Sequence, residues 1–285
     1  MFESFKNKWK IRVIETGKFK LDGGAMMGSV PKVLWNKTNP SDELNRIDLS
    51  MRCLLLDNGK DVILIETGIG NKNNKKFNDM FCIEQSSFPL KDELNKLDYK
   101  LEDITHVILT HLHFDHVGGA TIKYENKIIP TFPNAKYIIS KSNWDAAINP
   151  NPKDRASYLS DNFLPIIEND QLHLVDDNQY LFEDIQTISV YGHTTGQQLI
   201  KLNHDNDSLV FCADLIPLKS HLKIPWIMGY DLNAMKTIDE KTLFLNEAAK
   251  KNWILFFYHD PKCIAVRIKK SIKYFEVTRE LSIDD

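Results

Sequence analysis

The sequence predicts an α/β protein in which β-sheets lie in the middle and helices cover them from outside. Three observations predict this class. Short apolar strands recur along the chain, with turn residues between them. Fewer segments are helical, and the clearest of them, 233–251, carries apolar residues at helical spacing. The 285 residues contain no short repeat, low-complexity segment or long linker, so we expect residues 1–285 to form a single domain.

The first half of the chain consists mainly of predicted strands. We expect strands over 10–21, 52–57, 61–67, 103–110 and 135–140, followed by a short helix over 141–148. The turn Asn58-Gly59-Lys60 separates two of these strands, which predicts a hairpin with a glycine-containing loop. The strand within 103–110 is expected to be buried on both faces.

The second half repeats this arrangement of short strands. We expect strands over 171–175, 185–191, 197–203, 208–214 and 254–260. The helix over 233–251 has apolar residues at helical spacing, which are Met235, Ile238, Leu245 and Ala249. Near its start, Thr237 and Glu240 have the spacing of a capping box.

Two segments, 22–48 and 215–232, have no regular pattern and mix glycine or proline with methionine and tryptophan. Apolar loops of this length are uncommon and often line a binding site. A simple cover over the core is an equally favoured explanation. If the segments line a site, the candidate substrate contacts are Met27, His221 and Trp226.

Charge and cysteine content limit the partners and the compartment. The formal net charge is −3 and the pI is about 6.3, with lysines interspersed among acids, so we expect no nucleic-acid partner. No window approaches about 18 apolar residues, and the start has no signal-peptide run, so we expect no membrane partner. The cysteines at 53, 82, 212 and 263 are far apart and form no C-x-x-C pair. They favour free thiols and a cytoplasmic protein.

The segment "ILTHLHFDHVGGA", residues 108–120, concentrates metal-binding side chains after a predicted strand. It holds a third of the nine histidines, and its candidate ligands are His111, His113, Asp115 and His116. Imidazole and carboxylate together suit zinc and similar divalent ions. Four ligands from one loop cannot all bind one ion with good geometry, so we expect two ions about 3.5–4 Å apart.

Two ions require further ligands from other parts of the chain. His193, Asp214 and His259 each follow an apolar strand, in "YGHTTGQ", "CADLIP" and "FYHDP". A lone histidine after a strand is more often a loop or core residue than a ligand, but these three gain from the cluster. We interpret the isolated His106, His173 and His204 as structural or surface residues.

These motifs resemble those of a known family. "THLHFDHVGG" is similar to the H-x-H-x-D-H signature of the metallo-β-lactamase-fold hydrolases. "GHTTGQ", "ADLIP" and "YHDP" resemble the remaining metal-ligand motifs of that superfamily, in the same order, and the resemblance spans roughly residues 50–262. "GAMMGSVPKVLW" and "FPNAKYIIS" also resemble the branch of N-acyl-homoserine lactonases and organophosphate hydrolases.

The resemblance implies a specific fold and a specific set of ligands. The fold is an αβ/βα sandwich of two mixed β-sheets with helices on the outer faces and metals at one edge. It has two pseudo-symmetric halves, here roughly 1–155 and 156–285. The first metal would be held by His111, His113 and His193, the second by Asp115, His116 and His259, and Asp214 would bridge them.

The chain departs from the family pattern at two positions. Glu66-Thr67-Gly68 stands where the family usually has Asp-Thr-Gly, and that acid supports a ligand histidine from behind. Glutamate is one methylene longer, so the geometry of that ligand can differ. Many lactonases of the group also place a tyrosine three residues after the bridging aspartate, where this chain has Pro217.

The predicted function is metal-dependent hydrolysis of a small ester, lactone, thioester or phosphoester. Two divalent ions, most simply zinc, with manganese, cobalt or iron as alternatives, would lower the pKa of a bound water to about 7. Asp115 would orient the resulting hydroxide and carry its proton to the leaving group, and Asp214 would hold both ions.

Two alternatives of other classes stay open from the sequence. An iron-dependent persulfide dioxygenase resembles the same scaffold, and the ligand types do not exclude its mononuclear iron. The other alternative is a non-enzymatic metal-binding protein, and the seven candidate metal ligands argue against it. The expected partner is a small molecule, and the irregular apolar loops are compatible with a homodimer.

Overall fold

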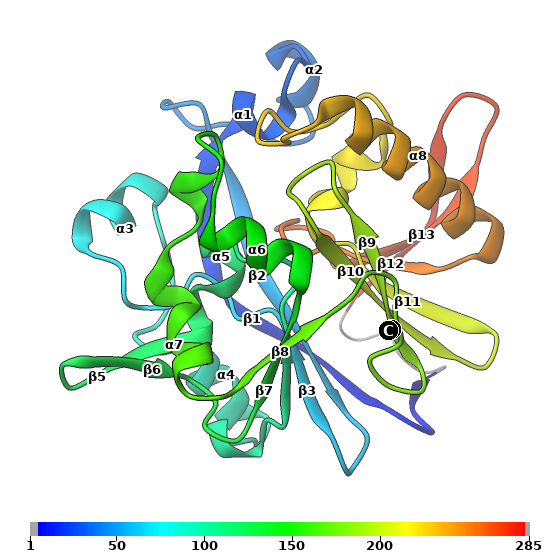
Figure 1. Cartoon of the computed structure of the whole chain (residues 1–285). Coiled ribbons are helices and arrows are strands. Elements are labelled where there is room, and N and C mark those ends of the chain that lie inside the picture. The colour runs from blue at the N-terminus through cyan, green and yellow to red at the C-terminus, as the bar shows by residue number, and fades with distance from the viewer. Residues whose placement is uncertain (1–4, 283–285) are drawn as a thin grey trace.

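The computed structural model describes residues 5–282 and contains two six-stranded sheets that face each other (Figure 1). The first sheet has the order β1-β2-β3-β4-β7-β8, and β3, β4, β7 and β8 run parallel. Its strands are β1 (Lys10–Asp22), β2 (Arg46–Asp57), β3 (Val62–Ile65), β4 (His106–Ile108), β7 (Lys136–Ser140) and β8 (Leu172–Val175). A separate hairpin joins β5 (Thr121–Tyr124) to β6 (Lys127–Pro130).

The second sheet has the order β14-β13-β12-β11-β10-β9. Only β11 and β12 run parallel in it, and the other neighbours are antiparallel. Its strands are β9 (Ile185–Val190), β10 (Gln197–His204), β11 (Asp207–Phe211), β12 (Ile254–Phe256), β13 (Ala265–Lys270) and β14 (Phe275–Leu281). Both sheets are therefore mixed.

Helices cover the sheets from outside. On the first sheet, α4 (Pro89–Lys96) packs against β1, and α6 (Lys141–Ile148) packs against β7 and β8. On the second sheet, α8 (Ala234–Lys251) packs against β13 (Figure 1). The remaining short helices are α1 (Gly23–Met27), α2 (Lys32–Trp35), α3 (Lys75–Phe81), α5 (Phe114–Val117) and α7 (Leu164–Glu168). The predicted αβ/βα sandwich is confirmed.

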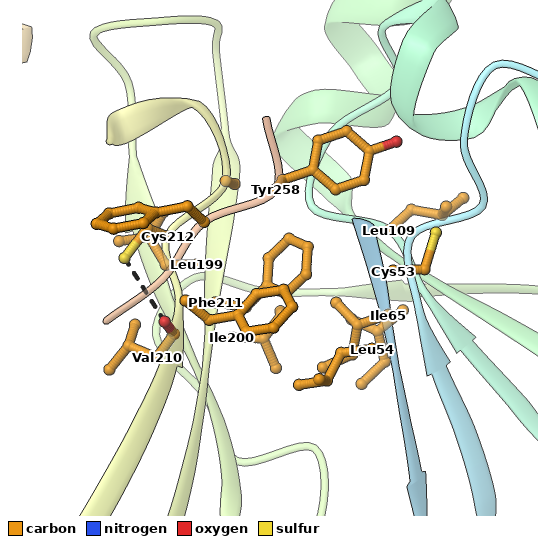
Figure 2. Packing of buried hydrophobic residues seen from close by; sticks show 14 of the residues in the cluster. Cys53, Leu54, Ile65, Leu109, Leu199, Ile200, Val210, Phe211, Cys212 and Tyr258 are labelled. Atoms are coloured by element: carbon orange, nitrogen blue, oxygen red, sulfur yellow. Dashed lines mark hydrogen bonds between the residues drawn. The ribbon is translucent and has the colours of Figure 1, made fainter. Parts of the chain in front are cut away.

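The hydrophobic core lies between the two sheets. Figure 2 shows Leu54 and Ile65 of the first sheet facing Ile200 and Phe211 of the second, and all four are at most 2% exposed. Burial of side chains of this size stabilises the fold by about 1.5–3 kcal/mol each. The same contacts fix the distance between the sheets, on which the metal centre depends.

Most predicted strands are present, and several elements were missed. The predicted helix over 141–148 has the bounds of α6, whereas the sequence patterns did not identify β13, β14 or the β5–β6 hairpin. The chain crosses from the first sheet to the second between Val175 and Ile185, later than the boundary near residue 155 that the family resemblance suggested. The crossing comes late because β8 still belongs to the first sheet and α6 packs against that sheet.

The start and the buried face of α8 differ from the prediction. Asn233 is the N-cap, because its side chain accepts a hydrogen bond from the backbone of Lys236. Glu240 instead accepts from the backbone nitrogens of Tyr191 and Gly192, so the predicted capping box is wrong. Met235 is 66% exposed, and the buried face is formed by Thr237, Lys241, Phe244, Leu245 and Ala248.

The two irregular segments contain little regular structure. Residues 22–48 hold α1, α2 and the first residues of β2, and 215–232 hold one 3-10 turn, Lys219–Leu222, and the end of another. The four cysteines are free, as predicted, and three of them are buried. Within residues 5–282, no helix combines the length and the apolar character needed to cross a lipid bilayer.

Candidate metal centre

The polar cluster of the motif lies where β4 ends and α5 begins. Its members are His111 and His113 in the extended segment after β4, and Asp115 and His116 in α5. The glycines that follow are required by close packing, because a Cβ atom on Gly118 would lie 2.1 Å from the carbonyl oxygen of Ile69. The loop is therefore pressed against the segment that follows β3.

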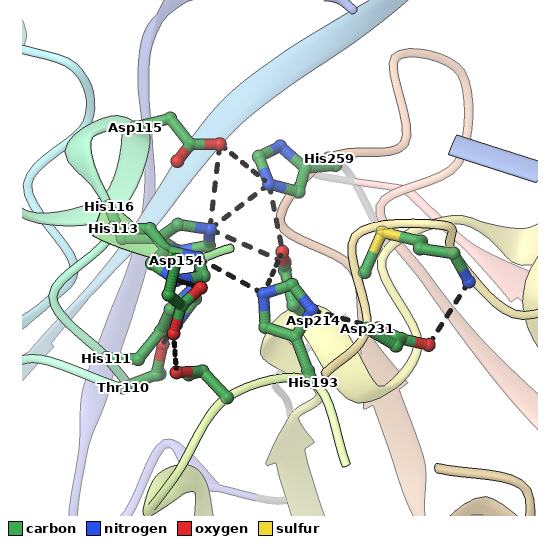
Figure 3. A network of polar contacts seen from close by, with 12 residues as sticks. Thr110, His111, His113, Asp115, His116, Asp154, His193, Asp214, Asp231 and His259 are labelled. Atoms are coloured by element: carbon green, nitrogen blue, oxygen red, sulfur yellow. Dashed lines mark hydrogen bonds and ion pairs between the residues drawn. The ribbon is translucent and has the colours of Figure 1, made fainter. Parts of the chain in front are cut away.

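The other three candidate ligands come from the second sheet. His193 follows β9, Asp214 lies in the 3-10 turn Ala213–Leu215 after β11, and His259 follows β12. All seven side chains converge between the two sheets, and each residue is at most 7% exposed (Figure 3). The structure thus brings together all seven predicted ligands.

Three histidines form what we call the first triad, which consists of His111, His113 and His193. Nδ1 of His113 lies 3.1 Å from Nε2 of His111 and 3.2 Å from Nε2 of His193. Nitrogen ligands about 2.0–2.1 Å from a tetrahedral zinc ion lie about 3.3 Å apart. The spacing of the first triad therefore fits one such ion.

The second triad consists of Asp115, His116 and His259. The Nε2 atoms of His116 and His259 lie 3.2 Å apart. Oδ2 of Asp115 lies 3.5 Å from Nε2 of His259 and 3.8 Å from Nε2 of His116. One carboxylate oxygen and two ring nitrogens thus surround a second possible ion position.

The carboxylate of Asp214 lies between the triads. Its Oδ2 lies 3.3 Å from Nε2 of His193, and its Oδ1 lies 3.4 Å from Nε2 of both His116 and His259 (Figure 3). Within the described part of the chain, Oδ1 accepts no well-formed hydrogen bond although it is buried. One oxygen therefore faces each triad.

Each histidine of the centre has a partner at the ring nitrogen that faces away from the centre. Four of these partners form hydrogen bonds: Oγ1 of Thr110 with His111 at 3.0 Å, Oδ1 of Asp154 with His113 at 3.1 Å, Oδ1 of Asp231 with His193 at 2.9 Å and the carbonyl oxygen of Ser50 with His259 at 3.0 Å. The fifth, Oε2 of Glu66, lies 3.5 Å from Nδ1 of His116, which is an ion-pair distance and not a hydrogen bond. Such partners fix the tautomer and the orientation of a ligand ring.

These outer partners show that a cation fits the centre. Carboxylate and carbonyl oxygens only accept hydrogen bonds, so His113, His193 and His259 carry their N–H on the outer nitrogen. When these rings are neutral, their inner nitrogens present lone pairs toward one another and toward the buried Asp214. Buried acceptors at these distances repel unless a positive charge lies between them. The donor set of imidazole and carboxylate suits divalent metal ions.

The protonation equilibria reflect the same arrangement. Burial lowers the pKa of His111 and His113 below the ordinary value of histidine. Burial also acts on His116, but the carboxylates of Asp214 and Asp115 outweigh it and raise the pKa of His116 well above its ordinary value. Although burial opposes the ionisation of Asp214, His116 and His259 hold the pKa of its carboxyl well below the usual range.

Glu66 and Tyr258 support the second triad. Glu66 is fully buried in the left-handed backbone region (φ 67°), and its Oε1 accepts from the backbone nitrogen of Thr110 at 2.7 Å. Its other oxygen is the 3.5 Å partner of His116. Tyr258 stacks on the His116 ring, with centroids 4.5 Å apart, and donates a hydrogen bond to the carbonyl oxygen of Asp115 at 2.6 Å. Sequence reasoning identified Glu66 and missed Tyr258.

The profile of the metallo-beta-lactamase superfamily matches residues 49–259 of this sequence. The chain belongs to the metallo-beta-lactamase superfamily. Curated relatives include an N-acyl homoserine lactonase from Bacillus cereus, 26% identical over 232 residues that cover 76% of this chain and 83% of that protein. Another from Bacillus sp is 25% identical over 267 residues, covering 88% of this chain and 93% of that protein.

Solved structures of the superfamily share the fold. A probable metal-dependent hydrolase from Staphylococcus aureus is 27% identical, with a TM-score of 0.88 and 96% of each chain covered. The dizinc quorum-quenching lactonase AidC is 22% identical, with a TM-score of 0.79, covering 96% of this chain and 95% of that chain. The predicted resemblance is confirmed, and so is the prediction of a superfamily hydrolase.

A pocket of about 320 Å³ opens onto the metal centre of this superfamily member. Its apolar lining residues are Leu21, Met26, Phe81, Phe114, Ala156 and Met228, and its polar ones beyond the seven candidate ligands are Lys153, Asp154, Ser157 and Tyr230. A larger cavity of about 480 Å³ lies beyond the turn after His259, but none of the seven candidate ligands lines it. The smaller pocket is therefore the candidate substrate site.

The three candidate substrate contacts from the sequence do not line this pocket. Met27 is fully buried, and its neighbour Met26 lines the pocket instead. His221 is 1% exposed and bonds through Nε2 to the carbonyl oxygen of Met26 at 2.9 Å. Trp226 is 8% exposed and lies beneath the Lys223 ammonium group. Of the three, His221 supports the pocket wall from behind through its hydrogen bond to Met26.

Proposed function

We propose that this protein is a binuclear metal-dependent hydrolase that cleaves the ester or lactone bond of a small, partly apolar substrate. The observation that carries this proposal is the carboxylate of Asp214, with one oxygen toward each triad. Two bound divalent ions, most simply zinc, would act as Lewis acids and lower the pKa of a bound water. The protein side chains supply the rest of the site.

The residues have distinct proposed roles. The first triad would hold one ion, the second triad the other, and Asp214 both. Asp115 lines the pocket, so its carboxylate would orient the attacking water and carry a proton to the leaving oxygen. The apolar wall with Phe81, Phe114 and Met228 would bind the apolar part of the substrate and exclude water. The names of the relatives make N-acyl homoserine lactones the first substrates to test.

The first experiment is elemental analysis of protein purified without added metal. About two equivalents of zinc, manganese or cobalt per chain support the binuclear site. Hydrolysis of lactones, esters, thioesters and phosphotriesters would then be measured on the loaded protein. Protein that holds no metal even after reconstitution would contradict the proposal.

The iron-dependent dioxygenase is not favoured. The relatives and structural neighbours described above are lactonases and hydrolases, and none of these is a dioxygenase. About one equivalent of iron per chain, together with oxygen uptake on a persulfide, would revive that alternative.

A variant of the second triad tests the mechanism. We expect His116→Ala to abolish hydrolysis, because it removes a proposed ligand while the fold around it stays in place. His173→Ala is the matched control, since His173 is exposed on β8. Undiminished activity of His116→Ala would contradict a metal mechanism at this site.

The cellular setting also stays a proposal. We infer a cytoplasmic enzyme of a small-molecule substrate, without a nucleic-acid or membrane partner, from the charge and the cysteines. A homodimer is compatible with the exposed apolar side chains of Val33, Leu34 and Leu44 near α2. Light scattering at several protein concentrations would test it.

A further inference from the structure

We propose that Tyr230 is a catalytic residue of this site, whose phenolic hydroxyl donates a hydrogen bond to the leaving oxygen of the substrate. The inference rests on the proposed function and adds a residue that lies outside every metal-binding motif of the sequence. It assigns a chemical role to the irregular segment 215–232, which carries Tyr230.

Tyr230 presents a free hydrogen-bond donor to the pocket. It lines the same pocket as Asp115, Asp214 and His259 and is 37% exposed. Among residues 5–282, no hydrogen-bond partner of its hydroxyl is found, whereas the Lys153 ammonium group in the same wall already donates to the carbonyl oxygen of Asp231. A substrate that enters the pocket therefore meets the Tyr230 hydroxyl unpaired.

The hydroxyl carries its proton throughout the working pH range. Burial raises the pKa of Tyr230 to about 12, and the carboxylates of Asp22 and Asp115 act in the same direction. Tyr230 and Asp115 line the same pocket, and Asp115 is the residue that the proposed mechanism uses to deliver a proton to the leaving oxygen.

The backbone on both sides of Tyr230 is held by hydrogen bonds, on one side to the metal centre and on the other to α1. Asp231 bonds through Oδ1 to Nδ1 of His193 at 2.9 Å and through Oδ2 to the backbone nitrogen of Met228 at 3.2 Å. The backbone nitrogen of Gly229 donates to the carbonyl oxygen of Ala25 at 2.8 Å. The phenol is therefore attached to a rigid turn, which is the condition for a preorganised donor.

The chemistry of an ester shows where such a donor acts. One ester and one water give a carboxylate, an alcohol and a proton, and the bond between the carbonyl carbon and the leaving oxygen breaks. The leaving oxygen takes the electron pair of that bond and then a proton. Tyr230 would stabilise the developing charge with a hydrogen bond and keep its own proton. An alkoxide needs this help more than 4-nitrophenolate, whose charge spreads over the ring.

The test compares two leaving groups in the metal-loaded Tyr230→Phe variant. An alkyl ester and a 4-nitrophenyl ester with the same acyl group would be assayed for kcat and KM, alongside metal content and melting temperature. We expect kcat/KM to fall about 100-fold for the alkyl ester and by no more than about threefold for the 4-nitrophenyl ester. The loss should lie in kcat, with two metals per chain retained. Tyr180→Phe is the matched control, because Tyr180 is 64% exposed and does not line the pocket.

Several outcomes would overturn the inference. Equal losses for both esters would mean that Tyr230 does not act on the leaving oxygen. A change in KM alone, or lost metal, would show a binding or structural role instead. A selective loss in Ser157→Ala rather than in Tyr230→Phe would assign the donor to the hydroxyl of Ser157, which lines the same pocket. If the wild type is active and the Tyr230→Phe variant is unaffected, only this inference is overturned. If the metal-loaded wild type is inactive on every ester and lactone, the proposed function is overturned as well.

Discussion

Side chains that never touch a metal ion determine how the five histidines of the centre present their nitrogens. Asp154 and Asp231 lie 41 and 38 residues from the histidines that they orient, His113 and His193. No sequence pattern marks such a partner, because a single acid in a loop looks like a surface acid. The candidate ligands were predictable because four of them cluster in one motif and the other three each follow an apolar strand. Glu66 was found only because it stands in a family motif.

Asp231 provides a test of this outer layer. We expect Asp231→Asn to weaken metal binding by about 10- to 100-fold, because an amide no longer enforces the N–H on Nδ1 of His193. Competition with a chromophoric zinc chelator measures the change. Asp239→Asn is the control, since Asp239 is exposed on α8. Equal affinities of the two variants would show that the carboxylate does not tune the ligand.

At the level of elements, α8 illustrates the limit of apolar periodicity. Its extent was predicted to within one residue at its start, but its buried face only in part, because Leu245 is buried as predicted whereas Met235 is exposed. That face includes Thr237 and the fully buried Lys241, whose ammonium group donates to the carbonyl oxygen of Trp226. A prediction based on the spacing of apolar residues places a lysine on the solvent-exposed face. The helix thus holds the 215–232 segment through a polar contact that cannot be recognised from the sequence.

Lys241 makes the stability of α8 dependent on pH. Burial lowers the pKa of Lys241 to about 7 from its ordinary 10.5. Between these values the unfolded chain binds a proton that the folded protein lacks, so the free energy of unfolding of the wild type rises with pH. Methionine does not titrate there. We expect the stability of Lys241→Met relative to wild type to be highest at pH 6 and to fall toward pH 9.

Urea unfolding at both pH values measures this effect. The exposed Lys250 offers a matched control as Lys250→Met, for which the difference from wild type should change little with pH. A Lys241→Met difference that is the same at both pH values would show that the buried amine stays charged in the folded protein.

For the whole molecule, the two sheets are joined by buried hydrogen bonds at the metal centre. The backbone nitrogen of Ser50 in β2 donates to the carbonyl oxygen of His259 at 3.0 Å. Arg52, also in β2, donates to the carbonyl oxygens of Phe257 at 3.1 Å and Asp260 at 2.8 Å. The sandwich itself was predictable from strand patterns and the family motifs. These contacts were not, because they join segments about 200 residues apart.

This connection predicts that the chain unfolds as one unit. We expect a single transition with equal calorimetric and van't Hoff enthalpies, as in a single cooperative domain. Differential scanning calorimetry measures both enthalpies, and two separate transitions would indicate two domains.

The same hydrogen bonds predict the effect of a substitution at Arg52. Arg52→Met should lower the free energy of unfolding by about 3 kcal/mol, because it leaves buried carbonyl groups unpaired. It should also weaken metal binding at the second triad. Arg12→Met on the exposed face of β1 is the control.

The division of the metal centre between the two sheets has a consequence for biogenesis. Asp115 and His116 leave the ribosome 143 or more residues before His259, and at ~5–20 residues per second that interval is on the order of ten seconds. During that time the nascent chain exposes histidines and an acid without the remaining ligands. The second triad is complete only after β12 has been translated and paired beside β11. A metal ion held by that triad would therefore be captured in one of the last steps of maturation.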